Sequence, residues 1–119
     1  MHNRHMPSDL TVTEIIDGPI ASVDRVYAFE RIRAICRETP RAVERARARL
    51  TAQYPRGDSP ATAECWLLLE GGLIVCAGVA ANSMRDAVDA LMARLRRRLG
   101  IVDAERRRQR IESLPATAT

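Results

Sequence analysis

The stretch RAVERARARLTA, residues 41 to 52, decides how this chain folds. Its Ala, Arg, Glu and Leu residues are strong helix formers. Its side chains also alternate, because Ala46, Ala48 and Leu50 fall on one parity and arginines fall between them. A strand turns alternate side chains to opposite faces, so a strand here has a small apolar face and a basic face. A helix here has only a thin stripe of small apolar residues.

The neighbouring segments favour the strand. Two apolar, β-prone runs at 61–70 and 73–81 meet at Glu-Gly-Gly and contain no proline, which is typical of a hairpin. A hairpin alone is only marginally stable and needs further strands. The sequence offers two, namely 41–52 and the β-branched segment LTVTEII at 10–16. We therefore predict that residues 41–52 are extended.

Two helices are predicted around these strands. The first has Ser22 as its N-cap and ends before Pro40, because the residue preceding a proline avoids the α region. The second begins with the capping-box-like pair Ser83 and Asp86 and ends at Gly100. The first helix has a mostly apolar stripe of Arg25, Ala28, Phe29, Ile32, Ile35 and Cys36. The second has a stripe of Met84, Ala87, Val88, Leu91, Leu95 and Leu99.

The resulting order of elements is β-α-β-β-β-α. It predicts an α+β fold, a two-layer sandwich in which a four-stranded sheet has both helices packed on one face. The domain is expected to span residues 10–100. Residues 1–9 are expected to be a flexible tail, 53–60 a loop, and 101–119 a basic extension with a disordered end. Within that extension, 101–112 could continue as a frayed helix.

All basic residues of the chain are arginine: 19 Arg and no Lys stand against 15 acids, for a net charge of +4. From Arg94 to Arg110 there are eight arginines and only Asp103 and Glu105 oppose them, so this stretch carries 8 − 2 = +6. Clustered arginine is the electrostatic footprint of a nucleic-acid partner, and its planar guanidinium grips phosphate with two hydrogen bonds. The other interpretation, open at this point, is a genome that prefers Arg codons and a solvated helix face.

The sequence gives little support to catalysis, metal binding or membrane insertion. No Ser, Cys or carboxylate lies in a convincing nucleophile–base arrangement, so no enzyme activity is predicted. Cys36, Cys65 and Cys76 form no C-x-x-C pair, and His2 and His5 lie in the polar tail, so no metal and no cofactor is expected. No apolar run approaches the roughly 18 residues of a membrane span, and the start MHNRHMPSDL has no apolar core. A cytoplasmic protein with no membrane or small-molecule partner is expected.

Four segments, in this order, resemble the ribosome hibernation-promoting factor family, also called protein Y. They are YAFERIRAI (27–35), RARARLT (45–51), AECWLLLEGGLIVCA (63–77) and SMRDAVDALMARLRRRL (83–99). The resemblance covers about residues 10 to 100 and rests on order and spacing together. Its most specific part is the last segment, with a small or acidic start, an Ala-Val-Asp core and a basic end. The chain looks like the short type, on an Arg-rich, actinobacterial-like branch.

The resemblance implies a ribosome-associated translation inhibitor, active under stress or dormancy, that occupies the mRNA and tRNA channel of the small ribosomal subunit. Structured RNA is read mainly by shape and backbone, so scattered guanidiniums suffice to neutralise rRNA phosphates. The expected rRNA-binding residues are Arg31 and Arg37 on the first helix, Arg94, Arg97 and Arg98 on the second, and Arg45, Arg47 and Arg49 on the outer face of the sheet.

One departure from the family concerns the outer face of the hairpin, which is usually polar or basic. Here six apolar residues are expected to share that face: Trp66, Leu68, Leu73, Val75, Ala77 and Val79. Because exposed apolar patches usually mark protein contacts, Trp66, Leu68 and Val75 are candidate contacts for another protein or a second copy. Coverage of the patch by the tails is the other open interpretation. The rival functions are a protein–protein adaptor that uses this face without ribosome binding and a general binder of double-stranded RNA.

Overall fold

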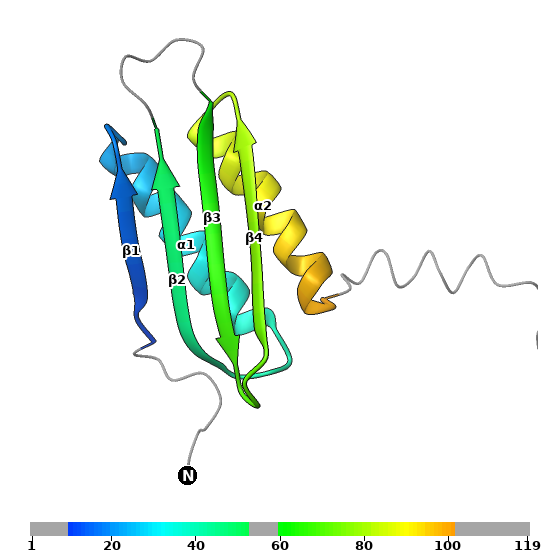
Figure 1. The fold of residues 1–119 in the computed structure, drawn as a ribbon. Coiled ribbons are helices and arrows are strands. Elements are labelled where there is room, and N and C mark those ends of the chain that lie inside the picture. The colour runs from blue at the N-terminus through cyan, green and yellow to red at the C-terminus, as the bar shows by residue number, and fades with distance from the viewer. Residues whose placement is uncertain (1–9, 53–59, 102–119) are drawn as a thin grey trace, which may run out of the picture.

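The computed structural model describes residues 10–52 and 60–101. They form β1 (Val12–Asp17), α1 (Ser22–Glu38), β2 (Val43–Thr51), β3 (Ala61–Leu69), β4 (Ile74–Ala81) and α2 (Met84–Leu99). The strands form one sheet in the order β1-β2-β3-β4, and both helices cover the same face of it (Figure 1). The predicted α+β class and element order are confirmed. The predictions for the N-terminal tail, most of the loop and the C-terminal extension lie outside the described residues.

Strand β2 is extended, as its alternation predicts, and it lies between two other strands. It runs parallel to β1, with Val12 opposite Ala46, and antiparallel to β3, with Trp66 opposite Arg47. The register shifts between Val43 and Arg45, which allows Val43 to be buried although it has the parity of the arginines. Every backbone group in the middle of β2 therefore has a neighbouring strand to pair with.

The two faces of β2 differ in size and charge. Ala46, Ala48 and Leu50 are buried against the helical layer, whereas the intervening arginines are exposed on the other face. The small inward residues leave room for larger side chains from the helices, such as the fully buried Ile32 and Leu91. The hydrophobic core thus lies between the sheet and the two helices.

Helix α1 has the predicted stripe but a different beginning. Its buried residues are Ala28, Phe29, Ile32, Ile35 and Cys36, while Arg25 of the predicted stripe is exposed. The N-cap is Ala21 and not Ser22, and no side chain caps this end. The reason is that the Ala21 carbonyl already accepts the first helical hydrogen bond, from the Arg25 amide at 3.1 Å, so Ser22 lies inside the helix.

Helix α2 begins and ends as predicted. The Ser83 hydroxyl accepts a hydrogen bond from the Asp86 amide at 3.1 Å, which satisfies one of the amides left free at a helix start. Gly100 follows the last turn with φ of 74°, a left-handed conformation that glycine adopts without a side-chain clash. Neither described helix is long and apolar enough to cross a membrane.

The β3–β4 hairpin differs from the prediction in which residues face outward. Its loop holds three residues, Glu70, Gly71 and Gly72, because the Leu69 amide donates to the Leu73 carbonyl at 2.8 Å. Both glycines have positive φ. A loop of three residues pairs positions of equal parity, whereas a loop of two pairs positions of opposite parity.

The outer apolar patch is consequently smaller than predicted. Leu68 lies opposite Ile74, and Trp66 lies opposite Cys76, so these four residues share the outer face. Val75 and Ala77 are buried toward the helices, and Val79 packs against the core, so the prediction of an outward Val75 contact was wrong. We call Trp66, Leu68 and Ile74 the outer apolar patch, and Leu73 is exposed at the adjoining turn.

Substitutions on the two faces of β2 are expected to have different effects. Ala48→Leu should lower the free energy of unfolding by about 1–3 kcal/mol, because extra methylenes overpack a closed core. Arg47→Leu, one residue away on the open face, should change it by no more than about 0.5 kcal/mol. Urea denaturation measures both, and equal destabilisation by the two substitutions would contradict the assigned faces.

Candidate nucleic-acid interface

The two helices lie side by side and run in the same direction (Figure 1). Near their N-terminal ends, Arg85 of α2 forms an ion pair with Asp24 of α1 at 3.6 Å. Near their C-terminal ends, the Arg96 guanidinium donates two hydrogen bonds to the Glu38 carboxylate, at 3.1 and 3.2 Å. These pairs bring the C-terminal ends of α1 and α2 to one end of the molecule.

That shared end carries a dense positive charge. Residues 37–41 and 94–99 contain six arginines and one carboxylate, Glu38, which gives 6 − 1 = +5. The carbonyl ends of the two helices favour cations close to them, because the helix dipole places partial negative charge there. We call these arginines the helix-end cluster: Arg37, Arg41, Arg94, Arg96, Arg97 and Arg98.

Two members of the helix-end cluster are directed at the free edge of the sheet. Arg94 donates from Nη1 to the Gly78 carbonyl at 3.2 Å, and Arg98 donates to the Cys76 carbonyl. Both carbonyls belong to β4, and no strand formed by the described residues lies on its other side. Charged side chains over an edge strand prevent it from pairing with the edge of another molecule. Arg94 and Arg98 therefore have a structural role, whatever else they contact.

Three members of the cluster point to solvent and have their charge available. Arg37, Arg41 and Arg97 are exposed, and their side chains have no hydrogen-bond or ion-pair partner among residues 10–52 and 60–101. Arg41 was not among the predicted contacts, although its position directly after Pro40 and the end of α1 could have indicated it. These three side chains can therefore donate to phosphate without giving up a partner in the described part of the chain.

Arg31, also predicted as an rRNA contact, lies on α1 beside Tyr27 and is only half-exposed. Its guanidinium is 5.9 Å from the centre of the Tyr27 ring, and Arg85 lies over the same ring at 4.2 Å. The Arg31 Nε is buried and has no hydrogen-bond partner in the described part of the chain. The Tyr27 hydroxyl donates to the Asp89 carboxylate, and this hydrogen bond raises the pKa of Tyr27. Arg31 thus packs beside Tyr27, the residue of α1 that contacts Arg85 and Asp89 of α2.

The three sheet-face arginines are not equivalent. Arg49 pairs with Asp17 at 3.4 Å and with Glu64 at 4.0 Å, so its charge is largely balanced. Arg45 and Arg47 are exposed and have no ion-pair partner among the described residues. All three lie on the face opposite the helices. The eight predicted arginines therefore do not form one surface, but divide between the helix end, the interhelical contact and the outer sheet face.

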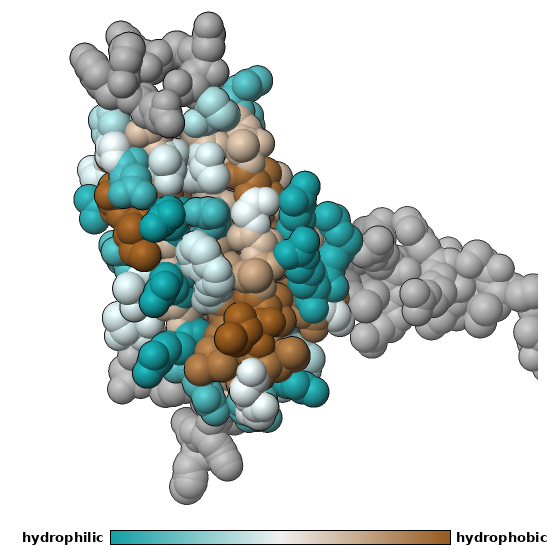
Figure 2. All heavy atoms as spheres, viewed as in Figure 1, coloured by the Kyte–Doolittle hydropathy of each residue, from teal (hydrophilic) through white to brown (hydrophobic). Residues whose placement is uncertain are grey.

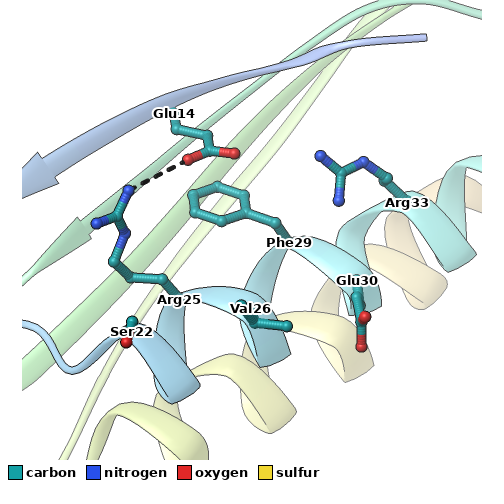
Figure 3. A pocket seen from close by; sticks show the side chains of 7 residues that line it. All are labelled: Glu14, Ser22, Arg25, Val26, Phe29, Glu30 and Arg33. Atoms are coloured by element: carbon teal, nitrogen blue, oxygen red, sulfur yellow. Dashed lines mark ion pairs between the residues drawn. The ribbon is translucent and has the colours of Figure 1, made fainter. Parts of the chain in front are cut away.

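A groove of about 360 Å³ lies beside β1 and α1 (Figure 3). Glu14 of β1 and Arg25 of α1 form an ion pair of 3.6 Å across it, next to the Phe29 ring. Its lining has both charges, since Glu30 and Arg33 also border it. The groove therefore has no net preference for an anion.

The cysteines give little support to catalysis or metal binding. Burial raises the pKa of Cys36 to about 11 and that of Cys65 to about 12, so both stay protonated and unreactive at neutral pH. Cys76 is exposed on the outer sheet face. Within the described ranges there is no group of three side chains that could hold a metal ion.

Comparison with solved structures shows where this fold occurs elsewhere. The N-terminal domain of protein Y from Thermus thermophilus matches with a TM-score of 0.59 and 20% identity, over 76% of this chain and 96% of that one. A ribosomal subunit interface protein from Coxiella burnetii matches with a TM-score of 0.60 and 16% identity, over 75% of this chain and 92% of that one. No family model and no curated protein matches the sequence. The chain shares the fold of these two proteins.

Removing the two edge-covering arginines is expected to promote self-association. In the double variant Arg94→Ala/Arg98→Ala, the carbonyls of Gly78 and Cys76 lose their donors and β4 becomes an open edge. Sedimentation velocity over a concentration series should show larger species than for the unsubstituted protein.

The variant Arg37→Ala/Arg97→Ala is the matched control for that experiment. It also removes two positive charges from this end of the molecule, but it leaves the edge of β4 covered. It should sediment like the unsubstituted protein. If both variants sediment alike, the arginines do not protect the edge.

Proposed function

We propose that this protein binds the rRNA of the small ribosomal subunit and blocks the mRNA and tRNA channel under stress or dormancy. The observation that carries the proposal is the fold, which over three quarters of the chain is that of a protein Y domain and of a ribosomal subunit interface protein. The segments that resemble the hibernation family in sequence lie in α1, β2, the β3–β4 hairpin and α2. Such a protein acts in the cytoplasm, where the ribosomes are.

Steric occlusion fits what the domain offers chemically. A folded domain that stays bound in a channel prevents mRNA and tRNA from entering it, without making or breaking a bond. The requirement is affinity for structured RNA, which comes mainly from contacts with phosphates and releases counterions. This mechanism needs a dense positive surface and no catalytic group.

The helix-end cluster is the surface best suited to rRNA. It gathers a charge of +5 on two short segments, and three of its side chains have no competing partner in the described part of the chain. On the outer sheet face, by contrast, Arg49 is already paired with carboxylates and apolar residues lie beside the other two arginines. We therefore assign the first rRNA contacts to Arg37, Arg41 and Arg97, with Arg94, Arg96 and Arg98 adding to the local field.

A second candidate function is docking of another protein or a second copy on the outer sheet face. The outer apolar patch favours it, because Ile74 is 63% exposed in a domain whose other large apolar residues are mostly buried. The two functions use different surfaces, the C-terminal ends of the helices and the outer face of the sheet, and do not exclude each other.

Charge reversal at the helix end tests the ribosome proposal. The variant Arg37→Glu/Arg97→Glu should bind small subunits at least about tenfold more weakly in a pelleting assay, which corresponds to about 1.4 kcal/mol. The reason is that two phosphate contacts are replaced by repulsion. The slope of log affinity against log salt should also fall by about 1 for each lost contact. Arg94 and Arg98 are left unchanged, because they hold the edge of β4.

The variant Arg45→Glu/Arg47→Glu is the control with the same change of charge. Both of its positions are exposed on the outer face, so the fold should be retained, which circular dichroism checks. Small subunits should bind it like the unsubstituted protein. If the helix-end variant pellets fully and the sheet variant does not, the rRNA interface lies on the sheet. If both pellet fully, arginine contacts do not hold the protein on the ribosome.

A further inference from the structure

The outer face of the sheet contains an open hollow of about 400 Å³. Its volume lies at the low end of the roughly 300–1,000 Å³ that ligand-binding pockets occupy. Two rows of side chains across the strands form it. In one row Arg47 is followed by Trp66, and in the other Arg45 is followed by Leu68 and Ile74.

Each row changes from basic to apolar as it crosses the sheet. The basic side chains come from β2 and the apolar ones from β3 and β4, so the hollow has a charged side and an apolar side. Figure 2 shows hydrophobic surface gathered over β3 and β4 close to their connecting turn, with hydrophilic residues on the β2 side. Trp66 is half-buried in the hollow, while Ile74 stands exposed at its rim.

The charged side of the hollow has no counter-charge within residues 10–52 and 60–101. Among the described residues that line the hollow, Arg45 and Arg47 are charged, and none is a carboxylate. Neither arginine has an ion-pair partner in the described part of the chain. A fitting ligand therefore carries an apolar group and negative charge within a few ångströms of each other.

We propose that this hollow binds a segment of another protein in which a large apolar side chain is flanked by carboxylates. The apolar side chain packs between Trp66 and Ile74, and the carboxylates pair with Arg45 and Arg47. Guanidinium and carboxylate groups can pair through two parallel hydrogen bonds, which gives such a site its orientation. The inference does not rest on ribosome binding, because the hollow lies on the face opposite the helical layer.

Two other occupants fit these residues less well. A second copy would present its own arginines to this hollow in a two-fold interface, so the charges would repel and not complement each other. A nucleic-acid base needs exposed aromatic faces to stack on, whereas the walls here are one half-buried Trp66 and the aliphatic Leu68 and Ile74. An acidic, apolar peptide satisfies both sides of the hollow.

The fluorescence of Trp66 offers a direct test, because it is the only tryptophan of the chain. The probe is the blocked peptide Asp-Glu-Phe-Leu-Glu-Asp, added to the full-length protein without ribosomes. It should shift the emission saturably. Two matched peptides, one with Lys in place of the acids and one with Gly in place of Phe-Leu, should bind at least tenfold more weakly.

Variants show whether the response comes from the hollow. Arg45→Glu/Arg47→Glu should lose the response, and Ile74→Ser, at an exposed position, should weaken it severalfold. Arg37→Glu/Arg97→Glu should respond like the unsubstituted protein, so the outcome is independent of the ribosome assay. The proposal is overturned if the acidic peptide does not bind or binds the sheet variant equally well. It is also overturned if oligouridylate competes better than the peptide, or if sedimentation shows a dimer that Ile74→Ser abolishes.

Discussion

The rest of the structure depends on the pairing of β2 with a strand on each side. Its parallel register with β1 and its antiparallel register with β3 fix which residues turn toward the helices. A slip of one residue would bury Arg47 and Arg49 and expose Ala46, Ala48 and Leu50. The cost of burying unpaired guanidiniums is far larger than any gain from such a slip, so the register is strongly specified.

This register also separates the arginines of the chain into groups with different roles. Those of β2 are held on the outer face, where Arg45 and Arg47 border an apolar hollow. The arginines of the helices lie in the other layer. Some of them contact the edge of the sheet or a carboxylate, and others have no partner among the described residues. Arg98 at the edge of β4 and Arg97 beside it are neighbours in sequence. Among residues 10–52 and 60–101, Arg98 has a backbone acceptor and Arg97 has none. Net charge alone does not reveal this division, because the division depends on where each side chain ends in the folded structure.

The sequence alone was sufficient to predict the parts of the fold that follow from local periodicity and capping. The extended β2, the stripe of α1 and the ends of α2 at Ser83 and Gly100 belong to this class. The prediction that Val75 faces outward was wrong. Which residues of β4 face outward depends on whether the hairpin loop holds two or three residues, and the sequence Glu-Gly-Gly does not determine this number. The edge contacts of Arg94 and Arg98 could not be predicted, since they require α2 to lie beside β4 in three dimensions.

Amide hydrogen exchange, read residue by residue, tests the central position of β2 most directly. A strand paired on both sides protects consecutive amides, so residues 46–50 should all exchange slowly. Edge strand β4 should alternate, with slow exchange at Val75 and Ala77 and faster exchange at Cys76 and Gly78, whose backbone groups face the free edge. Fast exchange at every second residue of 46–50 would place β2 at an edge and contradict the arrangement on which both proposed surfaces depend.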